Sequence, residues 1–279
     1  MTPDNDTKQH QALFWRDGKY QSGSLELIGE EPLSIRIEGS PYAVVMRTPG
    51  EELFHAAGFC LGEGLVETPD QFLNIGYCQD LDPNVIEIRL SPEQRTKVAD
   101  LLDRRGFVSQ TSCGICGKEM LKDLQQVLSP VDNGLTLEAE GIFRCLDKLF
   151  ETQNYYPRTK GSHAALILDH NLNRMAFSED VGRHNALDKA VGKVFMNRQL
   201  EKAGPLVLSS RISYELVQKA ARANLQIMIS KSRPTALAVE LGRALNITLA
   251  FASDKTELFV VSGEHRILNP GSCLVKHQA

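Results

Sequence analysis

The chain has 279 residues, of which 42% are hydrophobic and 24% are charged, a composition typical of globular proteins. Its net charge of −4 provides no overall field that would attract nucleic acid or an anionic membrane. No apolar run approaches the length needed to cross a bilayer, and the polar first residues lack a signal-peptide core. We therefore expect a cytoplasmic protein that inserts into no membrane and binds no nucleic acid.

The first hundred residues predict a mixture of strands and helices. A helix is expected within residues 49–67, ended by Gly62 and Gly64. Another begins after Ser91, because Ser91 and Pro92 provide an N-cap and an N1 proline. Apolar alternation bounded by Gly and Pro predicts strands near residues 13–18, 25–30, 32–39, 42–48, 73–79 and 84–90. We expect an α+β N-terminal domain over residues 12–109.

From about residue 110 the pattern changes to alternating strands and helices. Helices are predicted over residues 118–128, 137–153, 181–196, 213–223 and 234–245. Short strands are predicted over residues 164–169, 174–179, 206–210, 225–230, 246–252 and 257–262. Such alternation indicates an α/β layered domain with a largely parallel sheet. We place this second domain, together with the CxxC loop that precedes it, at residues 110–279.

Cys113 and Cys116 form the one local cysteine pair, in the segment TSCGICGKE over residues 111–119. The predicted helix after it would favour thiolate over thiol, and thiolate is the species that attacks sulfur or binds metal. Three interpretations are open: a thioredoxin-like disulfide switch, a zinc site and a sulfur relay. The mid-chain position disfavours the first, and the absence of a second CxxC pair disfavours the second. The other four cysteines are expected to be inert: Cys60, Cys78, Cys145 and Cys273.

Three predicted strand-to-helix junctions each contain an arginine, and two of them also contain hydroxyl residues. Ends of this kind bind ligands in open α/β sheets, and free N–H groups, hydroxyls and guanidinium groups suit phosphate. Ordinary helix capping is the alternative explanation for the Ser, Thr and Asp residues. His163 and His184 could carry protons or bind metal. The junctions comprise Asp180, Gly182, Arg183, His184 and Asn185; Ser209, Ser210 and Arg211; and Ser230, Lys231, Ser232, Arg233 and Thr235.

Several well-known site motifs are absent from the sequence. There is no GxxxxGK[ST] phosphate loop, no GxGxxG between a strand and a helix, and no GxSxG nucleophile motif. The HxE and PCxxC pattern of the zinc deaminases is also missing, since Ala164 and Ala165 follow His163.

Five segments in the same order and at similar spacings resemble the formate dehydrogenase accessory sulfurtransferases, the FdhD family. They are TSCGICGKE, TKGSHAAL, EDVGRHNALDK, LSSRISYELVQK and the PTALAVE segment after SKSR. The resemblance covers most of the chain, from the helix within residues 49–67 to the end. It implies an α+β N-terminal domain and a three-layer α/β C-terminal domain similar to the cytidine deaminase fold.

The resemblance also implies a sulfur carrier required for formate dehydrogenase activity. Such a protein accepts sulfur from an IscS-type cysteine desulfurase and transfers it to the molybdenum cofactor before the cofactor enters formate dehydrogenase. The motif cysteines fall on Cys113, which would hold the persulfide, and Cys116. The ligand would be the bis-guanine-dinucleotide form of the cofactor, with GDP as a fragment mimic, and a homodimer is expected.

With this ligand, His163 and the three junctions would contact the cofactor, and the family pattern assigns to it a segment after the penultimate strand as well. That segment departs from the family, which has Gly–Phe followed by basic residues. Here one lysine is kept and two carboxylates are added, in the run Ala252, Ser253, Asp254, Lys255, Thr256 and Glu257. Lys160 is a second departure, because the family often has small residues before the motif histidine, and it could be an additional phosphate ligand.

Two functions from other classes are kept as alternatives. One is a non-catalytic chaperone that binds the molybdenum cofactor and whose thiols only brace a loop. The other is a zinc-binding deaminase-like enzyme, which the alanines after His163 disfavour because they replace the acid–base glutamate.

Overall fold

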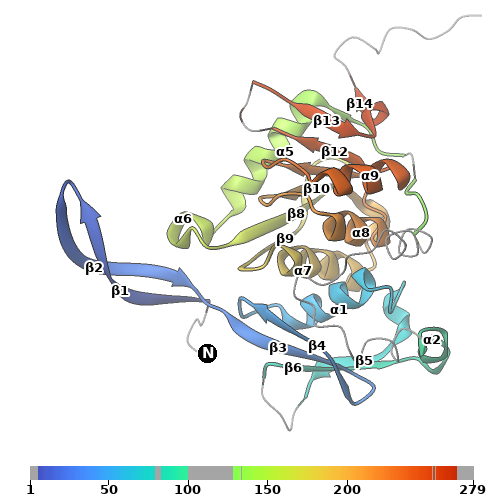
Figure 1. Ribbon diagram of the computed structural model, residues 1–279. Helices are drawn as coiled ribbons and strands as arrows, with labels where there is room; N and C mark the ends of the chain where they lie inside the picture. Colours follow the sequence, from blue (N-terminus) through green and yellow to red (C-terminus); the bar gives the residue numbers. More distant parts are fainter. Residues whose placement is uncertain are drawn as a thin grey trace, which may run out of the picture.

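The computed structural model describes residues 6–78, 83–99, 128–132, 134–252, 254 and 256–268. Within these residues the strands form a six-stranded sheet, a four-stranded sheet and two two-stranded ribbons (Figure 1). Helices pack between the two large sheets and on the outer face of the six-stranded one. None of the described helices has the length and apolar character needed to cross a membrane.

The N-terminal part contains a hairpin arm and the four-stranded sheet. Ser91 caps α2 as predicted, because its Oγ accepts a hydrogen bond of 3.3 Å from the Gln94 N–H. The predicted strands and both helix starts are confirmed, and the part of the second helix beyond residue 99 lies outside the described residues. The arm consists of β1 (Thr7–Arg16) and β2 (Lys19–Ile28). The sheet has the order β4-β3-β6-β5. Its strands are β3 (Glu31–Ile37), β4 (Ser40–Arg47), β5 (Phe72–Tyr77) and β6 (Val85–Leu90). The helices of this part of the chain are α1 (Glu52–Gly62), η1 (Pro69–Gln71) and α2 (Pro92–Lys97).

The six-stranded sheet confirms each strand predicted in the second half of the chain. Its order is β13-β12-β11-β10-β8-β9. The strands are β8 (His163–Asp169), β9 (Arg174–Asp180), β10 (Ala203–Leu208), β11 (Ile227–Ser230), β12 (Thr248–Phe251) and β13 (Phe259–Ser262).

The prediction of a largely parallel sheet is wrong. Only β10–β11 and β11–β12 are parallel pairs, whereas β8–β9, β8–β10 and β12–β13 are antiparallel. Connection length explains the difference, because a parallel pair needs a crossover of about a dozen residues or more. The links between β8 and β9 and between β12 and β13 are shorter than that and contain no helix, so the chain turns back on itself.

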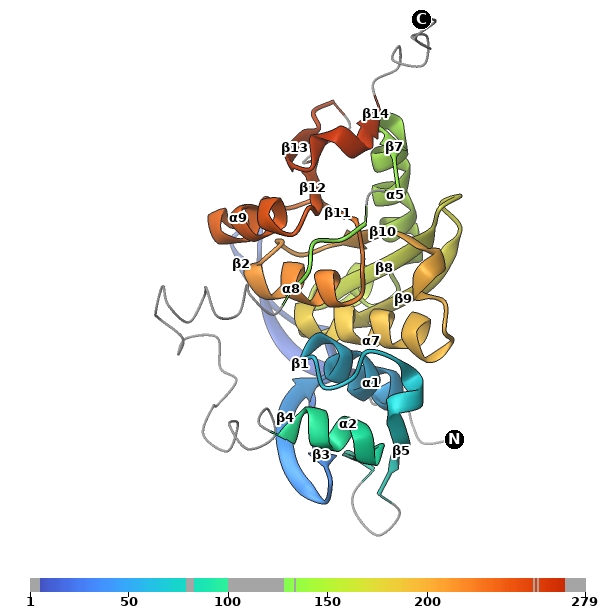
Figure 2. The same ribbon diagram turned by 90° about the vertical axis from the view of Figure 1, so that its right-hand side faces the viewer.

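Helices cover both faces of the six-stranded sheet, giving three layers. On one face α5 packs against side chains such as Leu166, Val207 and Ile229, while α7, α8 and α9 cover the other face (Figure 2). The alternation of side chains along each strand supplies both faces with apolar residues. The fold is thus mixed α/β, and likeness to the cytidine deaminase fold stays a prediction. The helices are α5 (Ala139–Thr152), α6 (Tyr156–Thr159), α7 (Arg183–Met196), α8 (Tyr214–Arg222) and α9 (Ala236–Ala244).

Three short elements complete the described chain. A two-stranded parallel ribbon lies beside α5, and two 3₁₀ turns precede β10 and the last strand. They are β7 (Leu137–Glu138) with β14 (Ile267–Leu268), η2 (Leu200–Lys202) and η3 (Glu264–Arg266).

The two large sheets share one apolar core, which α1 and α7 join. These helices cross with their backbones touching at Gly58 and Gly192, where a Cβ would lie within 2 Å of a carbonyl oxygen of the other helix. The predicted domain boundary between residues 109 and 110 lies outside the described residues and stays a prediction. Cys60 and Cys145 are buried, as expected, and burial raises the pKa of Cys145 to about 12. Cys273 lies outside the described residues.

Candidate functional site

The strand ends that hold the predicted ligand residues meet at one edge of the six-stranded sheet. Because β8 runs opposite to β9 and β10, it begins at the edge where they end. Cross-strand pairing there places His163 beside Asp180. Farther along the same edge, pairing joins Leu208 to Ser230 and Ser230 to Phe251. The fold therefore brings Lys160, His163 and all three predicted junctions to the same side of the sheet.

Hydrogen bonds within the protein occupy most of the serine hydroxyls at this edge. Ser209 Oγ accepts from the Ala164 N–H at 2.8 Å. Ser230, which is fully buried, donates from Oγ to the Ser210 carbonyl at 2.6 Å and accepts from the Ser232 N–H at 2.9 Å. These contacts fix the loops after β10 and β11. Ser232 is half-buried.

Thr235 is the N-cap of α9, as its residue type favours. Its Oγ1 accepts from the Ala238 N–H at 3.3 Å, and its N–H donates to the Ile212 carbonyl at 3.0 Å. Arg211 and Arg233 are exposed at the ends of β10 and β11. Within this edge, the guanidinium groups are thus more accessible to a ligand than the hydroxyls.

The starts of α7 and α8 have N–H groups that the described side chains do not cap. The residues before these helices are Gly182 and Ser213, and neither makes a side-chain cap hydrogen bond. Ser213 Oγ instead lies 3.5 Å from His184 Nε2. Uncapped first-turn N–H groups and the helix dipole both favour an anion.

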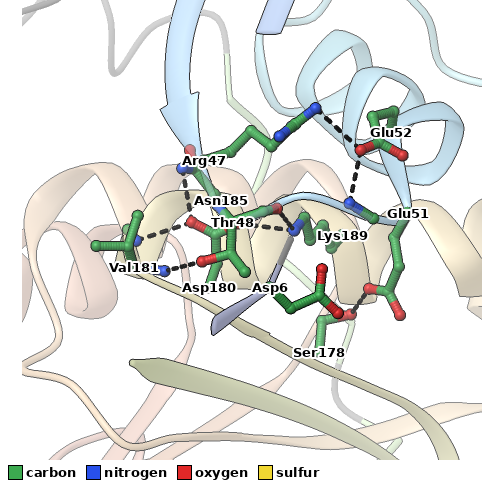
Figure 3. Close-up of polar contacts among 12 residues, drawn as sticks. Asp6, Arg47, Thr48, Glu51, Glu52, Ser178, Asp180, Val181, Asn185 and Lys189 are labelled. Atoms are coloured by element: carbon green, nitrogen blue, oxygen red, sulfur yellow. Dashed lines mark hydrogen bonds and ion pairs between the residues drawn. The ribbon is translucent and has the colours of Figure 1, made fainter. Parts of the chain in front are cut away.

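Asp180 anchors the start of α7 from the protein interior (Figure 3). Its fully buried carboxylate accepts from the Gly182 N–H at 2.8 Å and from Asn185 Nδ2 at 2.9 Å. It also accepts from the Thr48 N–H at 3.1 Å and pairs with the buried Lys189 at 2.7 Å. Lys189 Nζ donates to the Thr48 carbonyl at 2.7 Å, so one network joins the α7 start to the segment after β4.

Glu179, the neighbour of Asp180, holds the loop that precedes β8. Its carboxylate is 6% exposed and accepts from the N–H groups of Asn154, Tyr155 and Tyr156 at 2.6, 2.9 and 3.0 Å. A fourth hydrogen bond of 2.7 Å comes from the Ser162 hydroxyl. The carboxylate thus satisfies the start of α6 and fixes both ends of the loop 154–162.

Lys160 extends from this loop into solvent. It adopts left-handed backbone angles with φ of 54° at the end of α6, and its Nζ lies 5.0 Å from the centroid of the Tyr156 ring. The predicted role of Lys160 in phosphate contact stays a prediction.

His163 is half-buried at the first position of β8, close to Arg183 and His184. Burial lowers the pKa of its imidazole below the usual value, the Arg183 and His184 charges lower it further, and Asp180 partly opposes them. The ring is therefore neutral near pH 7 and can accept a proton or a hydrogen bond.

His184 is oriented by Glu215 from the first turn of α8. Its Nε2 lies 2.7 Å from Glu215 Oε2, and this hydrogen bond is the main reason that the pKa of Glu215 lies below its ordinary value. The contact assigns the proton to Nε2 and ties the start of α7 to the start of α8.

The described residues of the segment after β12 make polar contacts with one another, and its predicted contact with the ligand stays a prediction. Ala252 is buried, and the exposed Asp254 accepts hydrogen bonds from the N–H and hydroxyl of Thr256 and from the Glu257 N–H. The segment is closed by its own turn. Its other two predicted ligand residues, Ser253 and Lys255, lie outside the described residues, as do both motif cysteines, Cys113 and Cys116.

Sequence reasoning missed the residues that brace this edge, namely Glu179 and Glu215, and gave Asp180 only a place at a helix start. Glu179 and Asp180 follow each other at the end of a strand, and adjacent strand residues face opposite sides. That rule predicts two separate roles for them. The partners of each carboxylate come from distant segments, so no local pattern identifies them.

The protein thus has a mixed α/β fold in which cationic side chains, a neutral imidazole and helix starts without side-chain caps lie together at the strand ends. The FdhD/NarQ family model matches residues 28–268, and the chain belongs to this family. It is 34% identical over 271 residues to a Streptomyces avermitilis protein named sulfur carrier protein FdhD, covering 94% of this chain and 95% of that one. A Mycobacterium tuberculosis protein of the same name is 36% identical over 232 residues, covering 79% and 83%. The predicted family is therefore confirmed.

A solved structure from Desulfotalea psychrophila, described as a formate dehydrogenase accessory protein, has a similar fold. The TM-score is 0.74 at 22% identity, and the match covers 94% of this chain and 99% of that chain.

Proposed function

We propose that this protein is a sulfur carrier that serves formate dehydrogenase. Membership of the FdhD/NarQ family and the sulfur carrier names of relatives that match most of the chain support this role. Sulfur would come from a cysteine desulfurase. The Cys113 thiolate attacks the terminal sulfur of the donor's persulfide, which keeps its hydrogen; a new S–S bond gives Cys113–S–SH, and the donor's S–S bond breaks to release the donor thiolate. Cys116 would then act as a second carrier or resolving thiol.

The acceptor we propose is the molybdenum cofactor in its bis-guanine-dinucleotide form, bound as substrate before it enters formate dehydrogenase. The observation that supports this most is the meeting of His163, Arg183, Arg211 and Arg233 with the starts of α7 and α8 at one sheet edge. A dinucleotide has several phosphates, and it needs several anion sites on one surface. We expect a homodimer in which each subunit provides one such edge.

Calorimetry with GDP tests the ligand. Arg211→Ala and Arg233→Ala each remove one cation from the edge and should weaken binding by about 1.5–3 kcal/mol, the usual contribution of a hydrogen bond to a charged group. Arg174→Ala is the matched control, because Arg174 is exposed at the start of β9, on the opposite edge of the sheet. Unchanged affinity in both edge variants would remove this ligand from the proposal.

Mass spectrometry after incubation with a cysteine desulfurase and cysteine tests the relay. The Cys113 peptide should gain one sulfur atom, and Cys113→Ala should abolish both this gain and formate dehydrogenase activity in a strain that lacks the protein. Arg211→Ala should still load sulfur, since donor docking and cofactor binding use different groups. GDP binding without sulfur loading would favour a cofactor-binding chaperone, and stoichiometric zinc would favour a deaminase-like enzyme.

A further inference from the structure

Two phenylalanine rings are stacked at one end of the six-stranded sheet. Phe251, the last residue of β12, pairs across the strands with Phe259, the first residue of β13. Their ring centroids lie 4.8 Å apart, and the ring planes are 10° from parallel, a stacked arrangement that aromatic pairs favour. Phe251 is 7% exposed, whereas Phe259 is 39% exposed. Among the described strands β13 is the outermost at this end of the sheet, so the Phe259 ring has Phe251 on one side and no further strand on the other.

This stacked pair lies at the same edge as the predicted ligand residues. Phe251 pairs with Ser230, the last residue of β11, and residues 231–235 lead from there to the start of α9. Helix α9 lies beside β12 and β13 (Figure 1), and Arg243 in its last turn donates to the Val261 carbonyl at 3.2 Å. Helix α9 and strand β13 therefore run in the same direction, and both begin at this edge.

The spacing between the aromatic pair and the loop after β11 suits a nucleotide. Strands β11 and β13 are two strand spacings apart, which is about 10 Å, and the exposed Arg233 lies in the loop between β11 and α9. A nucleotide with its base on Phe259 and its phosphates near Arg233 would have its sugar between them. Every nucleic acid base has a planar face that can stack on an aromatic side chain, and one such contact changes affinity by roughly tenfold.

The loop between the two phenylalanines contains a charged carboxylate. Asp254 accepts hydrogen bonds from the Thr256 N–H at 2.8 Å, the Thr256 hydroxyl at 2.6 Å and the Glu257 N–H at 3.2 Å, all at Oδ1. The Thr256 hydroxyl and N–H hold the pKa of Asp254 below its ordinary value, so the group is ionised near pH 7. No described residue donates to its Oδ2. A carboxylate repels phosphate, but it accepts hydrogen bonds from guanine, whose N1–H and 2-amino group are neighbouring donors that adenine lacks.

We propose that Phe259 and Asp254 select guanine, with the base stacked on the Phe259 ring and its N1–H and 2-amino group donating to the Asp254 carboxylate. The inference rests on the proposed function, because it takes a guanine dinucleotide as the ligand, and it adds the residues that recognise the base. It also explains the carboxylates that this chain has after β12 in place of basic residues, since they suit a base and not a phosphate.

Calorimetry with GDP, ADP and inorganic pyrophosphate tests the stacking. The wild-type protein should bind GDP more tightly than ADP or pyrophosphate. Phe259→Leu keeps an apolar side chain beside Phe251 but removes the ring, so it should weaken GDP binding roughly tenfold and leave pyrophosphate binding unchanged. The control is Phe54→Leu, a 36% exposed position on α1, which should leave both affinities unchanged. Unchanged GDP affinity in Phe259→Leu, or an equal loss of pyrophosphate binding, would overturn the stacking.

A change of base preference tests the role of Asp254. Asp254→Asn keeps an oxygen that can accept from Thr256 and turns the other oxygen into an N–H donor. An amide suits xanthine, in which an acceptor oxygen replaces the 2-amino group. The variant should therefore bind GDP roughly tenfold more weakly and xanthosine diphosphate more tightly than the wild type does, with ADP affinity unchanged. A gain of affinity cannot result from misfolding, and a variant that keeps the wild-type preference for GDP would overturn the assignment.

Fluorescence can report on the stacked base directly, because Trp15 is the single tryptophan of the chain. In the double variant Trp15→Phe/Phe259→Trp, GDP should quench the introduced indole and saturate at the dissociation constant found by calorimetry, whereas pyrophosphate should not quench it. Trp15→Phe/Phe54→Trp is the control and should show no saturable quenching. Equal responses to GDP in the two double variants would contradict the subsite.

The outcomes separate this inference from the proposed function. A wild-type protein that binds no GDP would contradict the proposed ligand and, with it, the guanine subsite. GDP binding that no change at Phe259 or Asp254 affects would contradict the subsite alone.

Discussion

Replacing Gly58 with alanine should separate the two helices that join the sheets. A Cβ at Gly58 would lie 1.9 Å from the Asp188 carbonyl oxygen, about 1.5 Å short of the 3.4 Å at which ordinary contacts begin. The obstructing atoms are backbone atoms of α7, which cannot rotate away. The helices α1 and α7 would have to move apart along their contact, and the packed core around them would lose close contacts.

Two opposing effects set the magnitude. Alanine is favoured over glycine within a helix by about 0.5–1 kcal/mol. Overpacking a close-packed interior costs about 1–3 kcal/mol and occasionally more, and a backbone obstruction places this case at the upper end. We therefore expect Gly58→Ala to lower the free energy of unfolding by about 2 kcal/mol or more.

Urea denaturation followed by far-ultraviolet circular dichroism, at one fixed protein concentration, measures this change. The matched control is Gly62→Ala on the same helix, where a Cβ meets side-chain atoms of Lys219, the nearest at 3.0 Å, and no backbone atom. That variant should remain within about 1 kcal/mol of the wild type. A Gly58→Ala protein as stable as the wild type would refute the inferred backbone contact.

Three further predictions concern buried ionisable groups. Asp180→Asn should lower the free energy of unfolding by about 3–5 kcal/mol, because it leaves the Lys189 ammonium buried without its carboxylate. Lys189→Met should lower it less, because Asp180 keeps three N–H donors. Urea midpoints that reverse this order would contradict the network. His55 is fully buried, and burial, followed by the Lys189 charge, holds its pKa well below 6.5. Unfolding therefore takes up a proton, and the free energy of unfolding should fall as the pH drops below about 6.5, by up to about 1.4 kcal/mol per pH unit. The His55→Leu variant should show a smaller slope. Glu179→Gln should speed hydrogen exchange at amides 154–156, whereas equal exchange in both proteins would exclude the proposed bracing.

Local patterns predicted the elements of this fold but not all their directions. Ser91 and Pro92 marked the start of α2 because capping is a contact between residues near in sequence. The six strands of the larger sheet followed from their apolar runs. Strand direction depends on the connections, and the short links after β8 and β12 make those pairs antiparallel. Alternation of strands and helices was therefore a weaker guide to direction than the length of each link.

The candidate site shows a similar division. The rule that ligands bind at strand ends predicted that the three junctions lie together, and in the structure they do. This prediction held because it depends only on where the strands end. The role of each hydroxyl could not be predicted, since a serine or threonine at such a position caps a helix or contacts a ligand with the same chemistry. Thr235 caps α9, and Ser230 joins two loops, which only the assembled sheet determines.

The two neighbouring carboxylates of β9 connect the site to the rest of the molecule. Asp180 faces the interior, where Thr48 and Lys189 link it to the segment that follows β4. Glu179 faces the other way and holds loop 154–162, which contacts the base of the arm through Tyr155. Both carboxylates lie on β9, which pairs with β8 and places His163 beside Asp180. The hydrogen bonds of Glu179 and Tyr155 therefore connect the base of the arm, loop 154–162 and the start of β8 in one continuous set of contacts.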